Sequence, residues 1–525
     1  MPETHKRRII RSEKANESWK PLIHGEGEEP LGVKPEIGNV LATFIHLSDL
    51  HICDAASPAR LEFLDRIADP DNPLSAMVPY VGTYRAQEFL TTQVLESMVQ
   101  AVNEIKVGPL MQAPVDAVII TGDVIDNAQK NELNWYKGIL EGELIDPTSG
   151  VPGKATGAFV SDVETYDIHY YHPDGAPDGM AEDRPHTLHG FPIFKGVTQG
   201  ALTSFQATGL SHPWYAIHGN HDALLQGTAT PTAELEKLAT GSAKLSGLGE
   251  NPNLQDLFDA FGEIGPAKYP GVESLETTTV EPDARRSLVA IEDWVKIHTE
   301  CGHDHGLKKD ENQVSYWFRD ISSTVRLIAL DTVNRFGGWQ GCIHHEQMVW
   351  LKNLLAISKD KYVILTSHHP LSCLFNGYYP SGEEPPALEK EVLLLLEHFP
   401  NVIAWISGHV HDHKISERLK ADGRHMFWEI RTGSHIDWPQ QSRSIEIAKT
   451  KAGEIVIATV LIDHKGPVQF GGTPEECASP VALAGLSRQL AANDWQRQSG
   501  DFAVSLAEGL PEDRNIYLYA SDPLA

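Results

Sequence analysis

The sequence predicts an α/β protein whose β-strands are covered on both faces. Short apolar runs of strand length recur along the chain, each bounded by turn residues. Segments with apolar residues at helical spacing lie between several of these runs, which is the pattern of an α/β sheet protein. The runs are nearly continuous in Val, Ile and Leu, which is typical of strands buried on both sides.

The predicted elements follow this alternation from residue 40 onward. Strands are expected at 40–49, 115–123, 214–220, 325–331, 362–369, 401–409, 425–433 and 454–462. Helices are expected at 83–105, 344–358 and 389–399, with further helices within 231–247 and 479–497. The first helix is expected to end before Gly108 and Pro109, because both residues terminate helices.

The chain is predicted to form one main domain with two insertions. Residues 1–39 are polar and are expected to be an N-terminal arm. The main domain is expected at 40–462, with insertions at about 138–212 and 223–320. Both count as insertions because the polar motifs described below lie on both sides of each. Residues 463–525 are expected to be a C-terminal appendage.

Composition restricts the possible partners and the compartment. The net charge is −29, from 43 basic and 72 acidic residues, which argues against a long polyanionic partner such as nucleic acid. No apolar stretch approaches roughly 18 residues, so no membrane span is expected. Five scattered cysteines without a CxxC pair favour a reducing compartment, and the twin-arginine N-terminus lacks the apolar region of an export signal. A cytoplasmic location is therefore expected.

Five of the predicted strands end in Asp, Asn or His. The residues are Asp49 and His51, Asp123, Asn220 with His221 and Asp222, His368 with His369, and His409 with His411. In open α/β sheets, ligands bind outside the carboxyl ends of the strands, where these side chains would gather. Residues two apart in an extended segment point to the same side, so Asp49 and His51 can act together. The pattern predicts a metal site.

In chain order, the motifs DLH, GD, GNHD, HHP and GHVH resemble those of the calcineurin-like metallophosphoesterase superfamily. The resemblance covers about residues 40–462, and the large insertions are similar to those of some bacterial members. It implies a four-layer α/β/β/α sandwich of two mixed sheets flanked by helices. It also implies that the main domain is catalytic, with a dinuclear metal site at one edge of the sheets.

Carried over position by position, the resemblance implies nine site residues. One metal would be held by Asp49, His51 and His411, and the other by Asn220, His368 and His409. Asp123 would bridge the two metals. His221 would lie unligated beside the substrate as the catalytic acid, with Asp222 orienting it. His368 fits better than His369, because the superfamily spacing is His-x-Pro and Pro370 matches it.

The implied function is a dinuclear-metal-dependent phosphohydrolase that cleaves a phosphate mono- or diester by attack of a metal-bridging hydroxide. Two cations roughly 3.5–4 Å apart lower the pKa of water between them and neutralise phosphoryl oxygens. Carboxylate and imidazole ligands suit divalent or trivalent Mn, Fe or Zn better than Mg or Ca. A small-to-medium phosphoester substrate is expected, and the oligomeric state is left open. The alternative is a non-catalytic scaffold of the same fold that binds a protein partner.

Two positions depart from the patterns of better-known branches. Purple acid phosphatases have an iron-binding Tyr three residues after the bridging Asp, where this chain has Asp126. At the next position, calcineurin-type phosphatases have an Arg that binds the substrate phosphate, and this chain has Asn127 there. The first departure argues against a Tyr-ligated ferric site, and the second argues against protein phosphatase activity. A separate CGHDHG segment has Cys301, His303 and His305 at a zinc-like spacing, although a solvated loop is the favoured interpretation.

Overall fold

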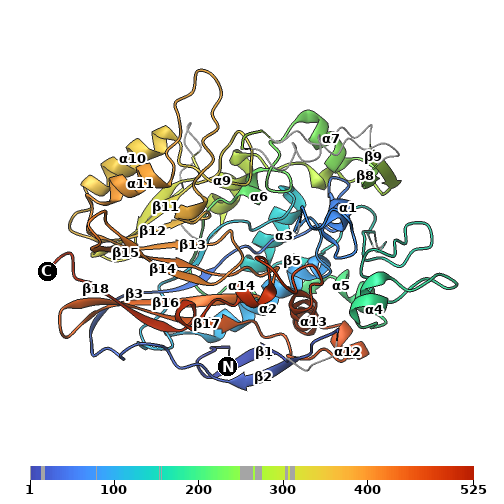
Figure 1. Cartoon of the computed structure of the whole chain (residues 1–525), viewed down its shortest axis with the longest axis horizontal. Helices are drawn as coiled ribbons and strands as arrows, with labels where there is room; N and C mark the ends of the chain where they lie inside the picture. Colours follow the sequence, from blue (N-terminus) through green and yellow to red (C-terminus); the bar gives the residue numbers. More distant parts are fainter. Residues whose placement is uncertain are drawn as a thin grey trace.

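Two six-stranded mixed sheets form the centre of the molecule (Figure 1). The computed structural model describes residues 2–12, 18–78, 80–152, 154, 156–248, 264–266, 275–301, 305–307 and 314–525. The first sheet has the strand order β18-β17-β16-β3-β4-β7. Its strands are β3 (Ile37–Leu47), β4 (Ala117–Ile120), β7 (Trp214–Ala216), β16 (Gln441–Thr450), β17 (Glu454–Asp463) and β18 (Ile516–Ser521).

The second sheet has the order β10-β11-β12-β13-β15-β14. Its strands are β10 (Trp317–Asp320), β11 (Val325–Leu330), β12 (Tyr362–Ser367), β13 (Val402–Ser407), β14 (Lys414–Leu419) and β15 (His425–Arg431). Strands β3, β4 and β7 are parallel to one another, as are β11, β12 and β13. The carboxyl ends of each parallel set therefore lie at one edge of its sheet.

Helices cover the outer face of each sheet, which makes four layers. The core between the sheets contains side chains from both, such as Phe44 and Ile119 from the first and Leu327 and Ile364 from the second. On the outer face of the first sheet pack α2 (Thr91–Glu104), α3 (Lys130–Glu141) and α9 (Ile291–Glu300). On the second lie α10 (His345–Ala356) and α11 (Glu389–Leu396) (Figure 1). The predicted fold class, a four-layer sandwich of two mixed sheets flanked by helices, is confirmed.

Smaller elements surround this sandwich. Three two-stranded sheets pair β1 (Arg7–Arg11) with β2 (Leu22–Glu26), β5 (Leu144–Ile145) with β6 (Phe205–Gln206), and β8 (Ala243–Leu248) with β9 (Leu275–Thr279). The short helices are α1 (Glu62–Asp65), α4 (Arg184–His189), α5 (Val197–Ala201), α6 (Asn220–Ala223), α7 (Ala233–Thr240), α12 (Pro474–Cys477) and α14 (Val504–Ala507). Single 3₁₀ turns are η1 (Arg66–Ala68), η2 (Glu88–Leu90), η4 (Ala284–Arg286), η5 (Leu371–Cys373) and η6 (Pro511–Asp513).

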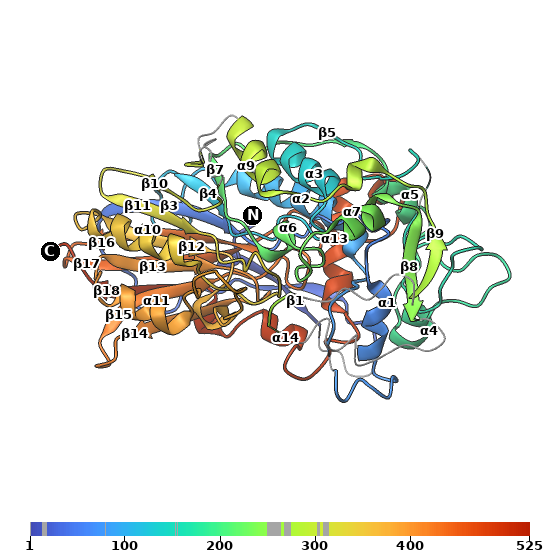
Figure 2. The same ribbon diagram turned by 90° about the horizontal axis from the view of Figure 1, so that it is seen from above.

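The C-terminal segment is joined closely to the sandwich. Helix α13 (Pro480–Ala492) packs against α2, and both figures of the ribbon place the two helices together (Figure 2). Strand β18 extends the first sheet by pairing with β17. The boundaries predicted for the arm, the insertions and the appendage stay a proposal. Within the described residues, no helix has the length and apolarity needed to cross a membrane.

Several elements differ from the prediction, and three of them show why. The helix expected at 83–105 begins only at Thr91, because the Arg85 side chain is held by Asp437 and its backbone N–H donates to Glu88. The helix expected within 231–247 ends at Thr240, and β8 begins at Ala243 after Gly241 breaks the helical run. Strand β16 was not predicted, because its sequence QSRSIEIAKT is rich in polar residues.

Candidate metal centre

The predicted ligands come together where the two sets of parallel strands end. One group surrounds the ring of His368. Its Nε2 lies 2.9 Å from Asn220 Oδ1, 3.1 Å from His409 Nδ1 and 3.2 Å from Asp123 Oδ2. These side chains follow β12, β7, β13 and β4, so four strand ends supply one cluster.

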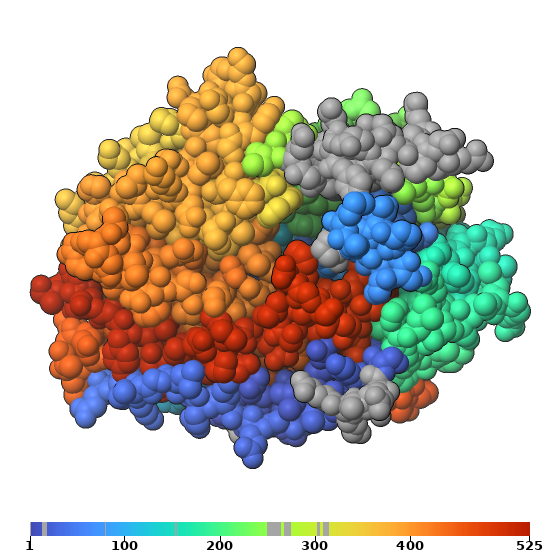
Figure 3. All heavy atoms as spheres, viewed as in Figure 1, coloured from blue at the N-terminus to red at the C-terminus, as the bar shows by residue number. Residues whose placement is uncertain are grey.

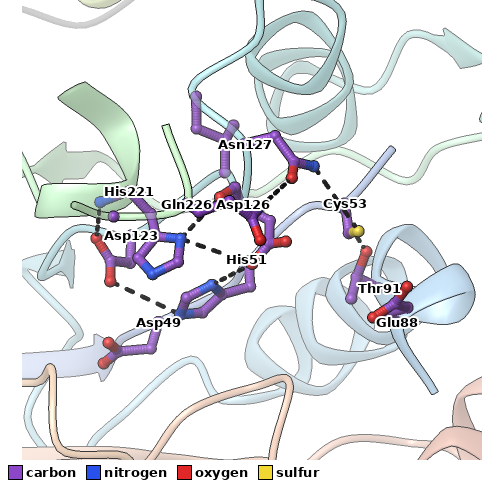
Figure 4. Close-up of polar contacts among 12 residues, drawn as sticks. Asp49, His51, Cys53, Glu88, Thr91, Asp123, Asp126, Asn127, His221 and Gln226 are labelled. Carbon is purple, nitrogen blue, oxygen red and sulfur yellow. Dashed lines mark hydrogen bonds and ion pairs between the residues drawn. The ribbon is translucent and has the colours of Figure 1, made fainter. Parts of the chain in front are cut away.

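The second group surrounds the ring of His411. Its Nε2 lies 3.2 Å from His51 Nε2 and 3.4 Å from Asp49 Oδ1. His51 Nε2 is also 3.7 Å from Asp123 Oδ2, a contact drawn in Figure 4. The ligand atoms of Asp49, His51 and His411 all lie within 4.8 Å of one another, as do those of Asp49, Asp123 and His368. Asp123 therefore lies between the two groups.

The backbone of these residues is strained in a way that singles out the site. Nine non-glycine residues have a positive φ within the described part of the chain, and five of them are predicted ligands. Those five are Asp49, His51, Asp123, His409 and His411. A left-handed conformation costs about 1–3 kcal/mol at a non-glycine residue and persists where the surrounding structure enforces it, as at functional sites. The strain concentrates where the predicted ligands converge.

Two glycines allow the backbones to approach closely at this edge. A Cβ on Gly408 would lie 1.7 Å from Ser48 Oγ and 2.3 Å from Asp49 Oδ2. This close approach lets the backbone N–H of His409 donate to both oxygens of Asp49 at 3.0 Å. Gly122 has a φ of +84° immediately before Asp123, a conformation that glycine adopts without strain.

The donor set fits transition-metal ions. The Asp49 and Asp123 carboxylates are buried, and neither has a Lys or Arg ion partner among the described residues. Their recorded ion partners are histidines, and pairs of imidazole nitrogens face each other at 3.1–3.2 Å. A buried carboxylate requires a compensating charge. Mixed carboxylate, amide and imidazole ligands are those that Mn, Fe and Zn accept.

The pKa values show how strongly the carboxylates act on the histidines. Burial lowers the pKa of His51 to about 4 despite its bond to Asp126. Burial also acts to lower the pKa of His368 and of His411, but nearby carboxylates raise both pKa values by more. Asp123 raises the pKa of His368 to about 9, and Asp437 together with Asp49 raises the pKa of His411 to about 9. The carboxylates therefore favour the charged form at His368 and His411, whereas burial lowers the pKa of His51 and His409.

Hydrogen bonds at Nδ1, the second ring nitrogen, orient three of the predicted imidazole ligands. His51 Nδ1 lies 2.8 Å from Asp126 Oδ1, and His411 Nδ1 lies 2.7 Å from Asp437 Oδ2. His368 Nδ1 lies 2.7 Å from the carbonyl oxygen of Thr121. Each contact fixes the ring so that Nε2 points into the cluster, the arrangement usual for metal-bound histidine.

The two orienting carboxylates are themselves held by arginines, of which Arg60 and Arg497 are buried. Arg60 contacts Asp126 and also donates to Glu88 Oε2 at 2.7 Å. Arg85 Nε lies 2.7 Å from Asp437 Oδ1, and Arg497 contributes a second contact to Asp437 Oδ2 at 3.0 Å. Arg497 belongs to the predicted C-terminal appendage, so that segment reaches the surroundings of the candidate metal centre.

Sequence reasoning missed these orienting carboxylates. Asp126 occupies the position of the purple acid phosphatase Tyr, and its place three residues after Asp123 is the signal that could have revealed its role. Asp437 gave no signal, because it lies outside the five motifs. Asn127, at the position of the calcineurin-type Arg, is buried and accepts hydrogen bonds from Arg60 and Gln226. Figure 4 shows Asn127 beside Gln226.

His221 lies at the open side of the cluster, with 23% of its side chain exposed. Its Nδ1 is 2.7 Å from the carbonyl oxygen of Asp126, and its backbone N–H donates to Asp123 Oδ1 at 2.8 Å. Figure 4 shows the ring beside His51, with ring centroids 4.6 Å apart. The imidazole is therefore next to the predicted ligands and accessible to solvent.

Asp222 does not have the orienting contact expected of it. Its Oδ2 accepts from the backbone N–H of Gly219 at 2.7 Å, and its Oδ1 accepts from those of Val124 and Ile125 at 2.8 and 3.2 Å. The carboxylate thus ties the turn after β7 to the turn after β4. Asp126 supplies the contact to the His221 ring, and an orienting role of Asp222 stays a prediction.

His369 also lies close enough to His368 and His409 for a shared ion. Both of its ring nitrogens are engaged elsewhere, however. Nδ1 lies 2.8 Å from Thr332 Oγ1, and Nε2 lies 2.9 Å from the carbonyl oxygen of Trp339. His368 directs its Nε2 into the cluster, so the geometry favours His368 as the ligand of the pair.

Two other features lie apart from the cluster. A cavity of about 760 Å³ is lined by Asp222 and His218 among others, but by none of the seven predicted ligands, all of which are described. In the CGHDHG segment, Cys301 Sγ lies 3.0 Å from His305 Nε2, whereas His303 falls outside the described residues. Neither feature adds a donor to the candidate centre.

Residues 188–413 match the family model of the calcineurin-like phosphoesterases. This range includes Asn220, His368, His409 and His411, while Asp49, His51 and Asp123 precede it. One similar solved structure is a Staphylococcus aureus protein described as a 5′-nucleotidase, in complex with alpha-ketoglutarate. The two chains are 11% identical, with a TM-score of 0.29, over 81% of this chain and 54% of that one. This chain thus spans about half the length of that protein. The comparison with curated proteins gave no match.

Proposed function

We propose, on the premise that this chain is a calcineurin-like phosphoesterase, that its metal centre is dinuclear and hydrolyses a small or medium-sized phosphate mono- or diester. The observation that supports this proposal is the sharing of Asp123. Its Oδ2 lies 3.2 Å from His368 Nε2 on one side and 3.7 Å from His51 Nε2 on the other. A carboxylate between two sets of donors suits a pair of ions.

The proposed ligands follow the two groups of side chains. Asp49, His51 and His411 would hold one ion, and Asn220, His368 and His409 would hold the other, with Asp123 shared. We infer Mn, Fe or Zn as the ions, because the set combines imidazole with oxygen donors. When bound, the ions supply Lewis-acid activation of water and neutralise charge on the phosphoryl group.

The chain's own residues would complete the chemistry. His221 is accessible, and its Nδ1 is fixed by the carbonyl oxygen of Asp126, which leaves Nε2 free to face a substrate. In its cationic form the ring can donate a proton from Nε2 to the leaving oxygen of the ester. The Asp126 carboxylate, 3.7 Å from His221 Nδ1, would stabilise that cation. Asp222 would act indirectly, by holding the turns that present Asp123 and Asn220.

Metal dependence is the first test of this function. We expect the purified protein to hydrolyse aryl phosphate esters, to lose that activity after chelation, and to regain it with Mn²⁺, Fe²⁺ or Zn²⁺. The release of a coloured phenol under each condition measures the effect. Absence of turnover with every ester and metal, together with stoichiometric capture of a protein partner, would favour the non-catalytic scaffold. A strong preference for long DNA or RNA would contradict the proposed compact substrate.

Asp437→Asn tests the orienting contact of His411. The substitution keeps the shape of the side chain but removes the charge that holds His411 Nδ1. Loss of such a contact typically weakens metal binding about 10- to 100-fold. We expect this loss at the ion of Asp49, His51 and His411, with the other ion little affected, as measured by metal titration of the apoprotein.

The matched control for this variant is Asp463→Asn. Asp463, at the end of β17, is likewise a buried aspartate. Its Oδ1 accepts a hydrogen bond from Gln441 Nε2 at 2.8 Å and contacts none of the predicted ligands. The control should bind both ions as the unmodified protein does. Equal weakening of both ions in Asp437→Asn would indicate a general loss of stability, since Arg85 and Arg497 would lose their partner, and would contradict a specific role in positioning His411.

A further inference from the structure

Trp339 is more exposed to solvent than the other tryptophans of this protein. The chain has eleven tryptophans, all within the described residues, and Trp339 alone is exposed, at 38%. It lies in the segment that follows β11, at the same edge of the second sheet as His368. Its indole stacks on the His409 ring with centroids 5.8 Å apart and an interplanar angle of 21°. An accessible indole thus adjoins a proposed metal ligand.

Two more exposed apolar side chains extend this surface. Phe375 is 41% exposed and meets Trp339 edge to face, with centroids 5.6 Å apart. Val410, between the proposed ligands His409 and His411, is 40% exposed. The three side chains come from the segments after β11, β12 and β13, so they gather at the edge where the candidate centre lies. Figure 3 shows one face of the molecule hollowed where orange, red and blue segments meet.

The backbone beneath these rings is firmly held. Asn376 is fully buried, and its Nδ2 donates to the carbonyl oxygens of Gly337 at 2.9 Å and Gln340 at 3.3 Å. The backbone of Gly341 donates to Cys373 at 2.9 Å and accepts from Asn376 at 3.0 Å. His369 Nε2 adds its contact to the Trp339 carbonyl oxygen at 2.9 Å. The segments of Trp339 and Phe375 are therefore fixed to each other and to the centre.

We propose that Trp339 and Phe375 form a stacking site for a planar aromatic ring in the alcohol part of the substrate ester. A ring stacked on the exposed indole would have that indole between it and the His409 ring, so it would lie at the side of the candidate centre. Preorganised aromatic side chains bind a planar ring at little entropic cost. A cationic group is disfavoured, because it would lie next to the proposed metal ions. This inference rests on the proposed function and names its substrate class.

Matched pairs of esters test the stacking site. The first pair is adenosine 5′-phosphate and methyl ribofuranoside 5-phosphate, whose leaving oxygens are both on C5 of a ribose and whose alcohols differ in the base. The second pair is benzyl phosphate and cyclohexylmethyl phosphate, which represent a simple aryl ring. If monoesters are not hydrolysed, the methyl diesters of the same alcohols replace them. We expect kcat/KM to favour the aromatic member by about 10- to 100-fold in at least one pair, as for ring stacking on an aromatic side chain.

The variant Trp339→Leu should bring that ratio close to one. The control Phe318→Leu removes another exposed aromatic ring, on β10 and 40% exposed, and should keep the ratio.

A preference in the nucleoside pair alone identifies a nucleobase, and a preference in the benzyl pair alone identifies a small aryl ring. Either result supports the stacking site. Turnover without any aromatic preference, or a preference retained in Trp339→Leu, overturns the stacking site but leaves the hydrolase standing. No turnover of any ester overturns both.

Discussion

Asp123→Asn is expected to remove nearly all activity and to weaken both metal sites. Asp123 is the residue shared by the two ligand groups, and an amide lacks the charge to bridge two cations. Metal ions contribute several kcal/mol to stabilising the transition state, so losing them should slow hydrolysis by ~10³-fold or more. Steady-state rates with an aryl ester and the metal content of the purified variant measure the two effects together.

Asp422→Asn is the control for this experiment. Asp422 lies in the exposed turn between β14 and β15, where it pairs with Arg424. Its amide variant should keep full activity and full metal content. If Asp123→Asn retains both ions with normal affinity, the assignment of Asp123 as the shared ligand is wrong even though the family stands.

His221→Ala should separate the catalytic acid from the metal ligands. The proposed role gives His221 a proton to donate and no ion to hold. The variant should therefore keep its full metal content and lose on the order of 10²–10⁴-fold in rate, the usual contribution of a positioned acid. The loss should be smaller for esters with good leaving groups, because their oxygen needs less protonation. Rates for a series of leaving groups, with parallel metal analysis, measure it.

His425→Ala serves as the matched control. His425 lies on β15, where its Nδ1 contacts Glu417 rather than any predicted ligand. Its removal should change neither rate nor metal content. An empty metal site in His221→Ala would contradict the unligated role. An equal rate loss across all leaving groups would argue against proton donation and favour a role in binding the phosphoryl group.

The family and the fold could be predicted because their signals are local. Each motif stands at a strand end, and strand ends of a parallel set meet at one edge whatever the loops between them do. The family match over residues 188–413 confirms the predicted resemblance for that part of the chain. The site residues, the domain boundaries and the cytoplasmic location stay predictions.

Strand β16 could not be predicted because two of its charged side chains, Arg443 and Glu446, are satisfied by distant partners. Arg443 is fully buried, and its guanidinium donates to the carbonyl oxygens of Asp513 and Arg514, each at 2.8 Å. Glu446 accepts from the backbone N–H groups of Leu110 and Met111. A buried polar residue with complete hydrogen bonds costs little, so apolar patterning fails as a signal there. The same reason hid Asp437, whose partners lie up to 352 residues away.

Metal content tests the central claim most directly. We expect the purified or reconstituted protein to bind two equivalents of Mn, Fe or Zn per chain, measured by elemental analysis and by native mass spectrometry. We also expect activity to appear only as the second equivalent binds. One equivalent at saturation, or full activity with one ion bound, would contradict a dinuclear centre that shares Asp123.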